Sequence, residues 1–133
     1  MIHKEFFYSL TVLENVLLAG SLYDKKSTKD AAKLLQELGI DAIAEMHPSE
    51  LSGGELKRMS IARGLYQDAG IILADEPTAD LDEENSAIVI QALRKEADNG
   101  KAVLVVTHEL DLLPYADVHY IMQAGNITKA QLL

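Results

Sequence analysis

The sequence predicts an α/β protein in which a helical block precedes a parallel β-sheet. Across residues 11–67, apolar side chains recur at helical spacing behind polar capping residues. From Gly70 onward, short apolar runs alternate with helical segments, and glycine or proline bounds them. Strand–helix–strand alternation is typical of a parallel sheet with right-handed crossovers. We therefore divide the chain into a helical part, residues 1–69, and a strand-bearing part, residues 70–133.

The first two predicted helices are recognised by their ends. Thr11 and Glu14 have the spacing of a capping box, and the apolar residues that follow share one face of a helix. Ser27 is placed to begin a second helix, which Gly39 ends as the residue just past the last turn.

The helical part ends with a short turn and a longer helix. Residues 41–46 are predicted to form a helical turn before a His-Pro pair. Ser52 and Glu55 repeat the capping-box spacing, and apolar residues continue at helical spacing to Leu65.

The strand-bearing part begins with an apolar run at residues 71–74. Gly70 and Pro77 bound this run, which is typical of a strand buried on both faces. A helix is predicted from residue 82 to residue 97, and Asn99-Gly100 ends it.

Two further strands are predicted to complete the sheet. Residues 102–107 form a second buried apolar run, and a short helix interrupted at Pro114 follows. A third strand is predicted at residues 118–122, with a turn at Gly125-Asn126 after it.

Composition narrows the function classes. The 133 residues carry a formal net charge of −9, which argues against nucleic-acid binding through a broad electrostatic surface. Cysteine is absent, so disulfides and thiolate metal sites are excluded. The longest apolar runs are too short to span a bilayer, and no secretion signal is visible at the N-terminus. We expect a cytoplasmic protein that reaches a membrane only through a partner.

A glycine pair at a helix start is the first candidate functional feature. The first amides of a helix lack intrahelical acceptors and carry partial positive charge. Gly53 and Gly54 would let a phosphate approach these amides, and the hydroxyl of Ser52 adds a polar contact. Alone, such a pair is more often a simple capped helix. The complete pattern Leu51–Glu55, followed by a Lys-Arg pair, favours phosphate binding.

Two adjacent acids, Asp75 and Glu76, follow the first predicted strand. In open α/β sheets, ligands bind beyond the carboxyl ends of the strands. Mg²⁺ prefers carboxylate oxygens and water, which suits Asp75, and Glu76 is placed to polarise an attacking water. For an arbitrary Asp-Glu pair a solvated turn is the better interpretation, but the neighbouring motifs outweigh it here.

His108 follows the second predicted strand, so it is expected at the same sheet edge as Asp75 and Glu76. An imidazole there can hydrogen-bond a terminal phosphate. A lone histidine after a strand is more often structural. The flanking Thr107 and Glu109, together with the buried strand before them, favour a functional role for His108.

Together these residues resemble the nucleotide-binding domain of ABC (ATP-binding cassette) transporter ATPases, over about residues 10–128. The resemblance rests on four motifs in the family's order and spacing: the signature motif at Leu51–Glu55, the Walker B strand with its catalytic glutamate at Ile71–Glu76, the D-loop at Thr78–Asp82, and the switch histidine at His108. The sequence of residues 74–78, Ala-Asp-Glu-Pro-Thr, is most similar to that of cassettes of lipoprotein-releasing and macrolide-exporting transporters.

The resemblance implies a partial P-loop NTPase-like (RecA-like) fold, with an α-helical subdomain at residues 1–69 and the C-terminal half of the core at residues 70–133. It also implies ATP and Mg²⁺ as cofactors of the complete cassette. In that family's terms, the catalytic residues are Glu76 and His108, the metal ligand is Asp75, and the nucleotide contacts are Ser52, Gly53, Gly54, Glu55 and Asp82.

One expected motif is missing from the sequence. The family's phosphate-binding loop, a glycine-rich segment ending in Lys-Ser/Thr, occurs nowhere in the 133 residues. Nothing in the chain would then hold the β- and γ-phosphates. We therefore expect part of an ABC transporter ATPase, with weak or no ATP binding and negligible hydrolysis by this chain alone.

The resemblance also implies partners. A transmembrane subunit is expected to dock on the helical block, and a second cassette is expected to stack against the signature motif. In this family the phosphate-loop strand lies beside the strand that carries the switch histidine. Without it, residues 102–107 would have an exposed apolar edge, so we expect self-association, strand swapping or a rearranged C-terminal region.

Two alternatives remain open. The first is a non-hydrolysing interaction subunit that donates its signature motif to a partner cassette. The second is a non-transport ABC protein of DNA repair or chromosome maintenance. The second fits less well, since such proteins usually carry a long coiled coil between the two halves of the site, whereas here a compact helical block precedes the signature.

Overall fold

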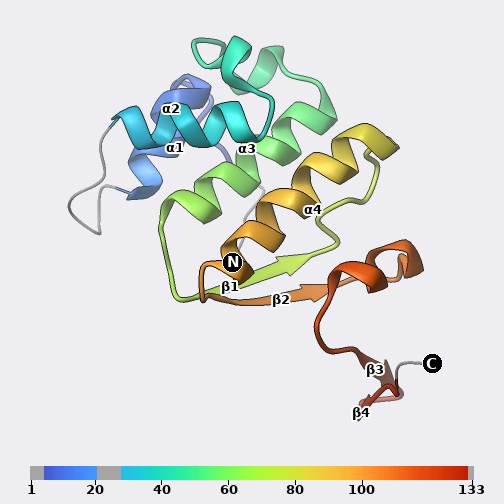
Figure 1. Cartoon of the computed structure of the whole chain (residues 1–133). Coiled ribbons are helices and arrows are strands. Elements are labelled where there is room, and N and C mark those ends of the chain that lie inside the picture. Colours follow the sequence, from blue (N-terminus) through green and yellow to red (C-terminus); the bar gives the residue numbers. More distant parts are fainter. Residues whose placement is uncertain (1–4, 21–27, 132–133) are drawn as a thin grey trace.

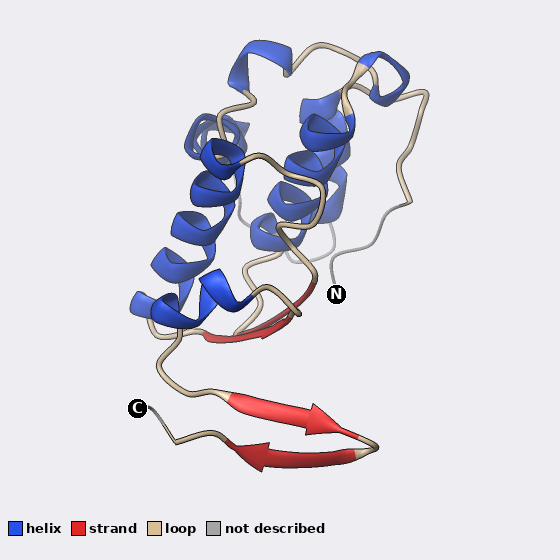
Figure 2. Ribbon diagram, turned by 90° about the vertical axis from the view of Figure 1, so that its right-hand side faces the viewer, coloured by secondary structure: helices blue, strands red, loops and turns tan. Residues whose placement is uncertain are grey.

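The computed structural model describes residues 5–20 and 28–131. Helices form a layer on one side of a two-stranded sheet, and a separate hairpin lies beyond it (Figures 1 and 2). The helices are α1 (Val12–Gly20), α2 (Thr28–Glu37), α3 (Gly53–Tyr66) and α4 (Glu83–Asp98), with short 3₁₀ helices η2 (Asp41–Ile43), η3 (Pro48–Glu50) and η4 (Leu110–Tyr115). The helices of the described residues all lack the length and apolar character of a bilayer-spanning helix.

The predicted helix ends are confirmed where they are described. The Thr11 N–H donates to Glu14 Oε2 across 2.7 Å, and the Glu14 N–H donates to Thr11 Oγ1 across 3.2 Å. Gly39 follows α2 with a φ of 66°, the left-handed conformation that favours glycine past a helix end. The predicted start at Ser27 lies outside the described residues.

The first two predicted strands form a parallel pair, as expected. Strand β1 (Ile71–Asp75) pairs with β2 (Ala102–Val106), and Leu73 lies opposite Leu104. Among the described residues, β1 and β2 form a sheet of their own. Their carboxyl ends therefore lie at one common edge, where the candidate site residues follow.

The expectation that these strands are buried on both faces is wrong. Ile72 and Ala74 are buried against the helices, whereas the side chains of the opposite face are between 44% and 66% exposed: Ile71, Leu73, Leu104 and Val106. In the described part of the chain, helices cover only one face of the pair (Figure 2). A wholly apolar strand is expected to be buried on both faces, but its sequence does not indicate which segment packs on the second face.

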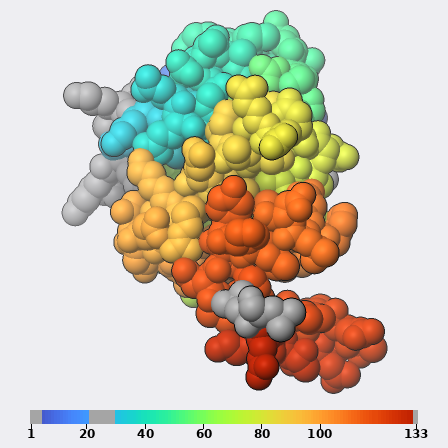
Figure 3. Space-filling view, turned by 45° about the vertical axis from the view of Figure 1, so that its right-hand side comes forward, coloured from blue at the N-terminus to red at the C-terminus, as the bar shows by residue number. Residues whose placement is uncertain are grey.

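The third predicted strand belongs to a different sheet. Strand β3 (Tyr120–Gln123) pairs antiparallel with β4 (Asn126–Lys129), rather than joining β1 and β2. Ala124 and Gly125 have φ values of 50° and 79°, the two left-handed residues that a tight hairpin turn requires. The hairpin projects from the body of the molecule (Figure 3). The turn at Gly125 was predicted, whereas β4 was not.

One buried cluster joins the helical part to the strand-bearing part. The largest fully buried apolar side chains are Leu35, Leu38, Ile40, Met59 and Ile61, and residues of β1 and α4 such as Ile72 and Val89 pack in the same cluster. This shared core fixes α3 and α4 against the β1–β2 pair, and so positions the segments that carry the site.

Candidate functional site

Glu76 occupies an unusual backbone position directly after β1. Its φ is 46°, in the left-handed region that side-chain-bearing residues rarely adopt. Its N–H donates to Val106 O across 2.7 Å, which anchors the turn to the end of β2. Backbone strain of this kind persists only where surrounding contacts hold it, and it concentrates at functional sites.

Side chains that follow β2 hold the Glu76 carboxylate. Thr107 Oγ1 donates to Oε2 across 2.9 Å, and the His108 N–H donates to Oε1 across 3.1 Å. His108 Nδ1 lies 2.6 Å from the same Oε1. The predicted convergence of Glu76 and His108 at one sheet edge is therefore seen in the structure.

These contacts change the proton affinity of Glu76. Partial burial raises the pKa of the carboxyl group, but hydrogen bonds from Thr107 and His108 outweigh it, together with attraction to the imidazole. The net pKa of Glu76 is lowered from its ordinary value of 4.5. The group is therefore a carboxylate near neutral pH, held in one orientation.

The remaining surface of this edge is open to solvent. The His108 side chain is 84% exposed, so its Nε2 is accessible to a ligand. Asp75, the last residue of β1, is exposed as well. The edge thus presents a fixed carboxylate, a second carboxylate and an accessible imidazole nitrogen.

A second set of hydrogen bonds, made by Thr78 and Glu109, holds Thr107 in place. Thr78, which is 1% exposed, donates from Oγ1 to Glu109 Oε2 across 2.7 Å. The Glu109 N–H donates to Thr107 Oγ1 across 3.0 Å, and Thr107 in turn holds Glu76. The sequence did not predict these contacts of Thr78, Thr107 and Glu109. It indicated Thr107 and Glu109 only as the residues that flank His108.

The predicted phosphate-binding helix start has the expected local structure. Ser52 caps α3: its Oγ accepts from the Glu55 N–H across 3.2 Å, and its own N–H donates to Glu55 Oε1 across 2.9 Å. The amides of Gly53 and Gly54 precede the amide that Ser52 satisfies. A Cβ added at Gly53 would meet nothing within 4 Å, so this helix tip faces open space.

The same helix tip is fastened to the segment after β1. Lys57 Nζ donates to Ala79 O across 3.0 Å, and a Cβ added at Gly54 would lie 3.4 Å from Leu81. Residues 78–82 thus contact α3 on one side and the segment after β2, through Glu109, on the other.

Asp82 has a structural role in this chain. It caps α4, because Oδ1 accepts from the Asn85 N–H across 2.7 Å and Oδ2 accepts from Asn85 Nδ2 across 3.0 Å. Both oxygens are engaged by Asn85. The structure therefore places Asp82 at the start of α4, and its contact with a nucleotide stays a prediction.

The residues present fit part of a Mg–ATP site. Asp75 supplies a solvent-accessible carboxylate of the kind that Mg²⁺ prefers, and Gly53 leaves backbone amides open to a phosphate. Within the described residues, no group of three or more acidic or histidine side chains is arranged to hold a metal ion.

Parallel strands that bring acids and an imidazole to one carboxyl edge, in a chain with an open glycine-rich helix tip, are typical of a nucleotide-binding domain. The protein-family model described as ABC transporter matches residues 1–79. The chain belongs to the ABC transporter family.

Curated relatives and solved structures agree with this assignment. The chain is 38% identical over 121 residues to the macrolide export ATP-binding/permease protein MacB of Pasteurella multocida (strain Pm70), covering 89% of this chain and 19% of that protein. It is 37% identical over 130 residues to the glutamine transport ATP-binding protein GlnQ of Geobacillus stearothermophilus, covering 94% of this chain and 54% of that protein. The chain thus spans from about a fifth to about half of these relatives.

The fold matches that of solved cassettes. In the dimeric, post-hydrolysis structure of the ATP-binding cassette MJ0796 bound to ADP and Pi, the matched part covers 98% of this chain and 61% of that chain, with a TM-score of 0.85 and 30% identity. The predicted fold class, part of a P-loop NTPase-like (RecA-like) core with a helical subdomain, is confirmed by this likeness.

Proposed function

We propose that this chain supplies the signature motif and the acidic sheet edge of an ATP-binding cassette that couples ATP binding and hydrolysis to transport. The observation that carries the proposal is the contact between Glu76 and His108 at the sheet edge. It occurs in the same chain as the open, capped helix tip at Gly53.

Each site residue has a role in this proposal. The amides of Gly53 and Gly54, with Ser52, bind phosphate oxygens of a nucleotide held mainly by a second cassette. Glu76 orients and polarises the attacking water, and His108 donates a hydrogen bond to the terminal phosphate. Asp75 would hold Mg²⁺, which supplies charge neutralisation at the β- and γ-phosphates.

Partners and location follow from the same proposal. The helical part, residues 1–69, docks on a transmembrane subunit, while residues 70–133 belong to the RecA-like core. The chain would then act in the cytoplasm at the inner face of the membrane. A phosphate-binding loop has to come from a segment outside these 133 residues, so we expect this chain alone to bind Mg-ATP weakly or not at all.

A second candidate is a non-hydrolysing subunit that only donates its signature motif. The open tip at Gly53 favours it, because donating a signature needs no phosphate loop in the same chain. ATP hydrolysis would then belong to the partner cassette alone.

The test joins this chain to a phosphate-loop segment taken from the GlnQ relative and measures ATPase activity. We expect activity in the joined protein, its loss in Glu76→Gln, and a strong loss in Gly53→Asp, whose carboxylate would repel phosphate. Gly70→Asp is the matched control, because an added Cβ meets nothing within 4 Å at either glycine.

One result separates the two candidates, and two others would contradict parts of the proposal. An inactive joined protein, together with stimulation of an intact GlnQ cassette by the unmodified chain in trans, favours the signature-donating subunit. Equal loss in Gly53→Asp and Gly70→Asp would contradict phosphate binding at the helix tip. Binding of Mg-ATP to this chain alone well below about 1 mM would contradict our view of the missing loop.

A further inference from the structure

The loop that leads from β1 to α4 folds as two overlapping turns. The Ala79 N–H donates to Glu76 O across 3.3 Å, and the Leu81 N–H donates to Thr78 O across 3.1 Å. Glu76 and Asp80 have φ values of 46° and 65°, in the left-handed region. Residues with side chains keep this conformation only where surrounding contacts hold it. The shape of the β1–α4 loop therefore depends on contacts with the rest of the chain.

Lys57 of α3 provides one of these contacts. Its Nζ donates to Ala79 O across 3.0 Å. Because the ammonium is charged, such a hydrogen bond is stronger than one between neutral groups. Ala79 O belongs to the peptide plane between Ala79 and Asp80, and rotation of this plane is how Asp80 would leave its left-handed conformation. The bond from Lys57 therefore holds the strained part of the loop directly.

The geometry of α3 connects Lys57 to the glycine-rich tip. Lys57 lies one helical turn after Gly53, so the two positions share one face of the helix. Helical side chains lean toward the helix N-terminus, which directs Lys57 back toward the tip. A Cβ added at Gly54 would lie 3.4 Å from Leu81, so the loop also packs closely on the first turn of α3.

The same loop determines where Glu76 lies. The Glu76 backbone is fixed at its N–H by Val106 O and at its carbonyl by the Ala79 N–H. Its carboxylate accepts from Thr107 Oγ1 and from the His108 N–H. A loop free to change shape at Ala79 would no longer hold the Glu76 backbone, and the carboxylate would spend less time on its two donors.

We propose that Lys57 is a positioning residue for Glu76. Its ammonium fixes the Ala79 carbonyl, the β1–α4 loop keeps its shape, and the carboxylate stays oriented toward an attacking water. This inference rests on the proposed function, in which Glu76 polarises that water. The alternative role for a lysine near the helix tip is direct phosphate binding, and the two roles predict different kinetics.

The first test measures amide exchange by NMR in the full chain, without nucleotide. In Lys57→Met, which keeps a long apolar side chain, we expect the amides of Ala79 and Leu81 to exchange about tenfold faster or more. Rates are compared relative to the amide of the buried Val89 in α4, which reports opening of the whole chain. Lys57→Arg keeps a cationic donor and should remain close to the parent chain.

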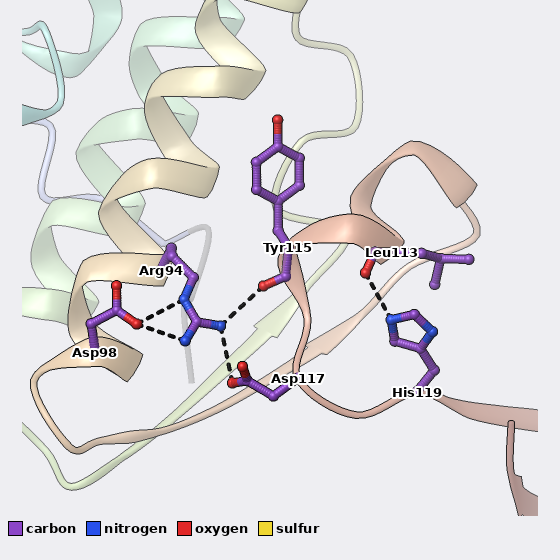
Figure 4. Close-up of polar contacts among 6 residues, drawn as sticks. All are labelled: Arg94, Asp98, Leu113, Tyr115, Asp117 and His119. Atoms are coloured by element: carbon purple, nitrogen blue, oxygen red, sulfur yellow. Dashed lines mark hydrogen bonds and ion pairs between the residues drawn. The ribbon is translucent and has the colours of Figure 1, made fainter. Parts of the chain in front are cut away.

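Arg94 provides a matched control. It also donates to a backbone carbonyl, with Nη1 3.1 Å from Tyr115 O, and its other contacts are with Asp98 and Asp117 (Figure 4). Arg94→Met therefore removes a cation and the same kind of hydrogen bond from a different part of the chain. The two loop amides should exchange in this variant as they do in the parent.

The second test measures steady-state kinetics in the joined protein that carries the phosphate-loop segment of the GlnQ relative. We expect Lys57→Met to lower kcat about tenfold and to change the KM for Mg-ATP little, because Glu76 acts on the water rather than on nucleotide binding. Lys57→Arg should recover most of kcat, and Arg94→Met should keep both parameters.

Three results would overturn the proposal. The first is unchanged exchange of the two loop amides in Lys57→Met, and the second is equal acceleration in Lys57→Met and Arg94→Met. The third is a raised KM with an unchanged kcat in Lys57→Met, because Lys57 then binds phosphate. An inactive joined protein would instead count against the proposed function, and amide exchange in the chain alone would still decide whether Lys57 holds the loop.

Discussion

Thr78 Oγ1 donates a hydrogen bond to Glu109 Oε2 across 2.7 Å, and this bond joins the segment after β1 to the segment after β2. Glu109 is also connected through Thr107 to Glu76. Lys57 connects the same region to α3 through Ala79 O. Hydrogen bonds thus connect α3, whose start is the glycine-rich tip, to the acidic sheet edge at Glu76.

Replacing Thr78 tests this link. Thr78→Val keeps the shape of the side chain and leaves the Glu109 carboxylate without its donor, so we expect a loss of about 1–3 kcal/mol in the free energy of unfolding. Urea denaturation followed by circular dichroism measures it. Thr78→Ser retains the hydroxyl and should lose clearly less, and equal losses in the two variants would mean that the methyl contact matters more than the hydrogen bond.

The pKa of Glu76 should respond to Thr107. Hydrogen bonds to the carboxylate lower the pKa of Glu76 in the folded chain, so the contacts with Thr107 and His108 are complete above the ordinary value of 4.5 and are lost as the pH falls through the lowered pKa. In a carbon-13 NMR titration we expect a Glu76 midpoint below 4.5. Thr107→Val should raise that midpoint, and Thr107→Ser should leave it in place. An unchanged midpoint in Thr107→Val would show that His108 alone holds the carboxylate.

Asn15 should be intolerant of a charge. This buried side chain accepts from the Phe7 N–H across 3.0 Å, and its Nδ2 donates to the carbonyl oxygens of Phe7, Leu10 and Thr11. Asn15→Asp would set a carboxylate oxygen against those three carbonyls, at an expected loss of about 2–4 kcal/mol. The exposed Asn126 provides the control, since Asn126→Asp should change the unfolding midpoint little. Similar losses at the two positions would contradict a special role for Asn15.

Local signals in the sequence predicted the local structure well. The capping boxes at Thr11 and Ser52 formed as their spacing indicated, since both depend only on residues three positions apart. The parallel pairing of β1 and β2 followed from alternation of strand and helix. The meeting of Glu76 and His108 followed in turn, because the ends of parallel strands share one edge.

Features that depend on distant partners escaped prediction. An apolar run does not reveal whether both of its faces will be covered, and Leu73 and Leu104 lie on an uncovered face. The segment near Tyr120 was expected in the parallel sheet, but its hairpin partner β4 is rich in polar residues and gave no strand signal. Nor does sequence spacing indicate that Thr78 and Glu109 touch, because 31 residues separate them.

The hydrogen bonds from Arg94 to Tyr115 and Asp117 mark a boundary between the folded body and a part of the chain that unfolds more easily. All residues of β3 and β4 are exposed, and a lone two-stranded hairpin is only marginally stable in water. The hairpin, which follows Asp117, therefore unfolds as a low-energy unit of its own, while α3 and its packed neighbours remain folded. Amide protons of the hairpin should exchange with deuterium well before those of α3, and a protease should trim this end first and leave the helical layer whole.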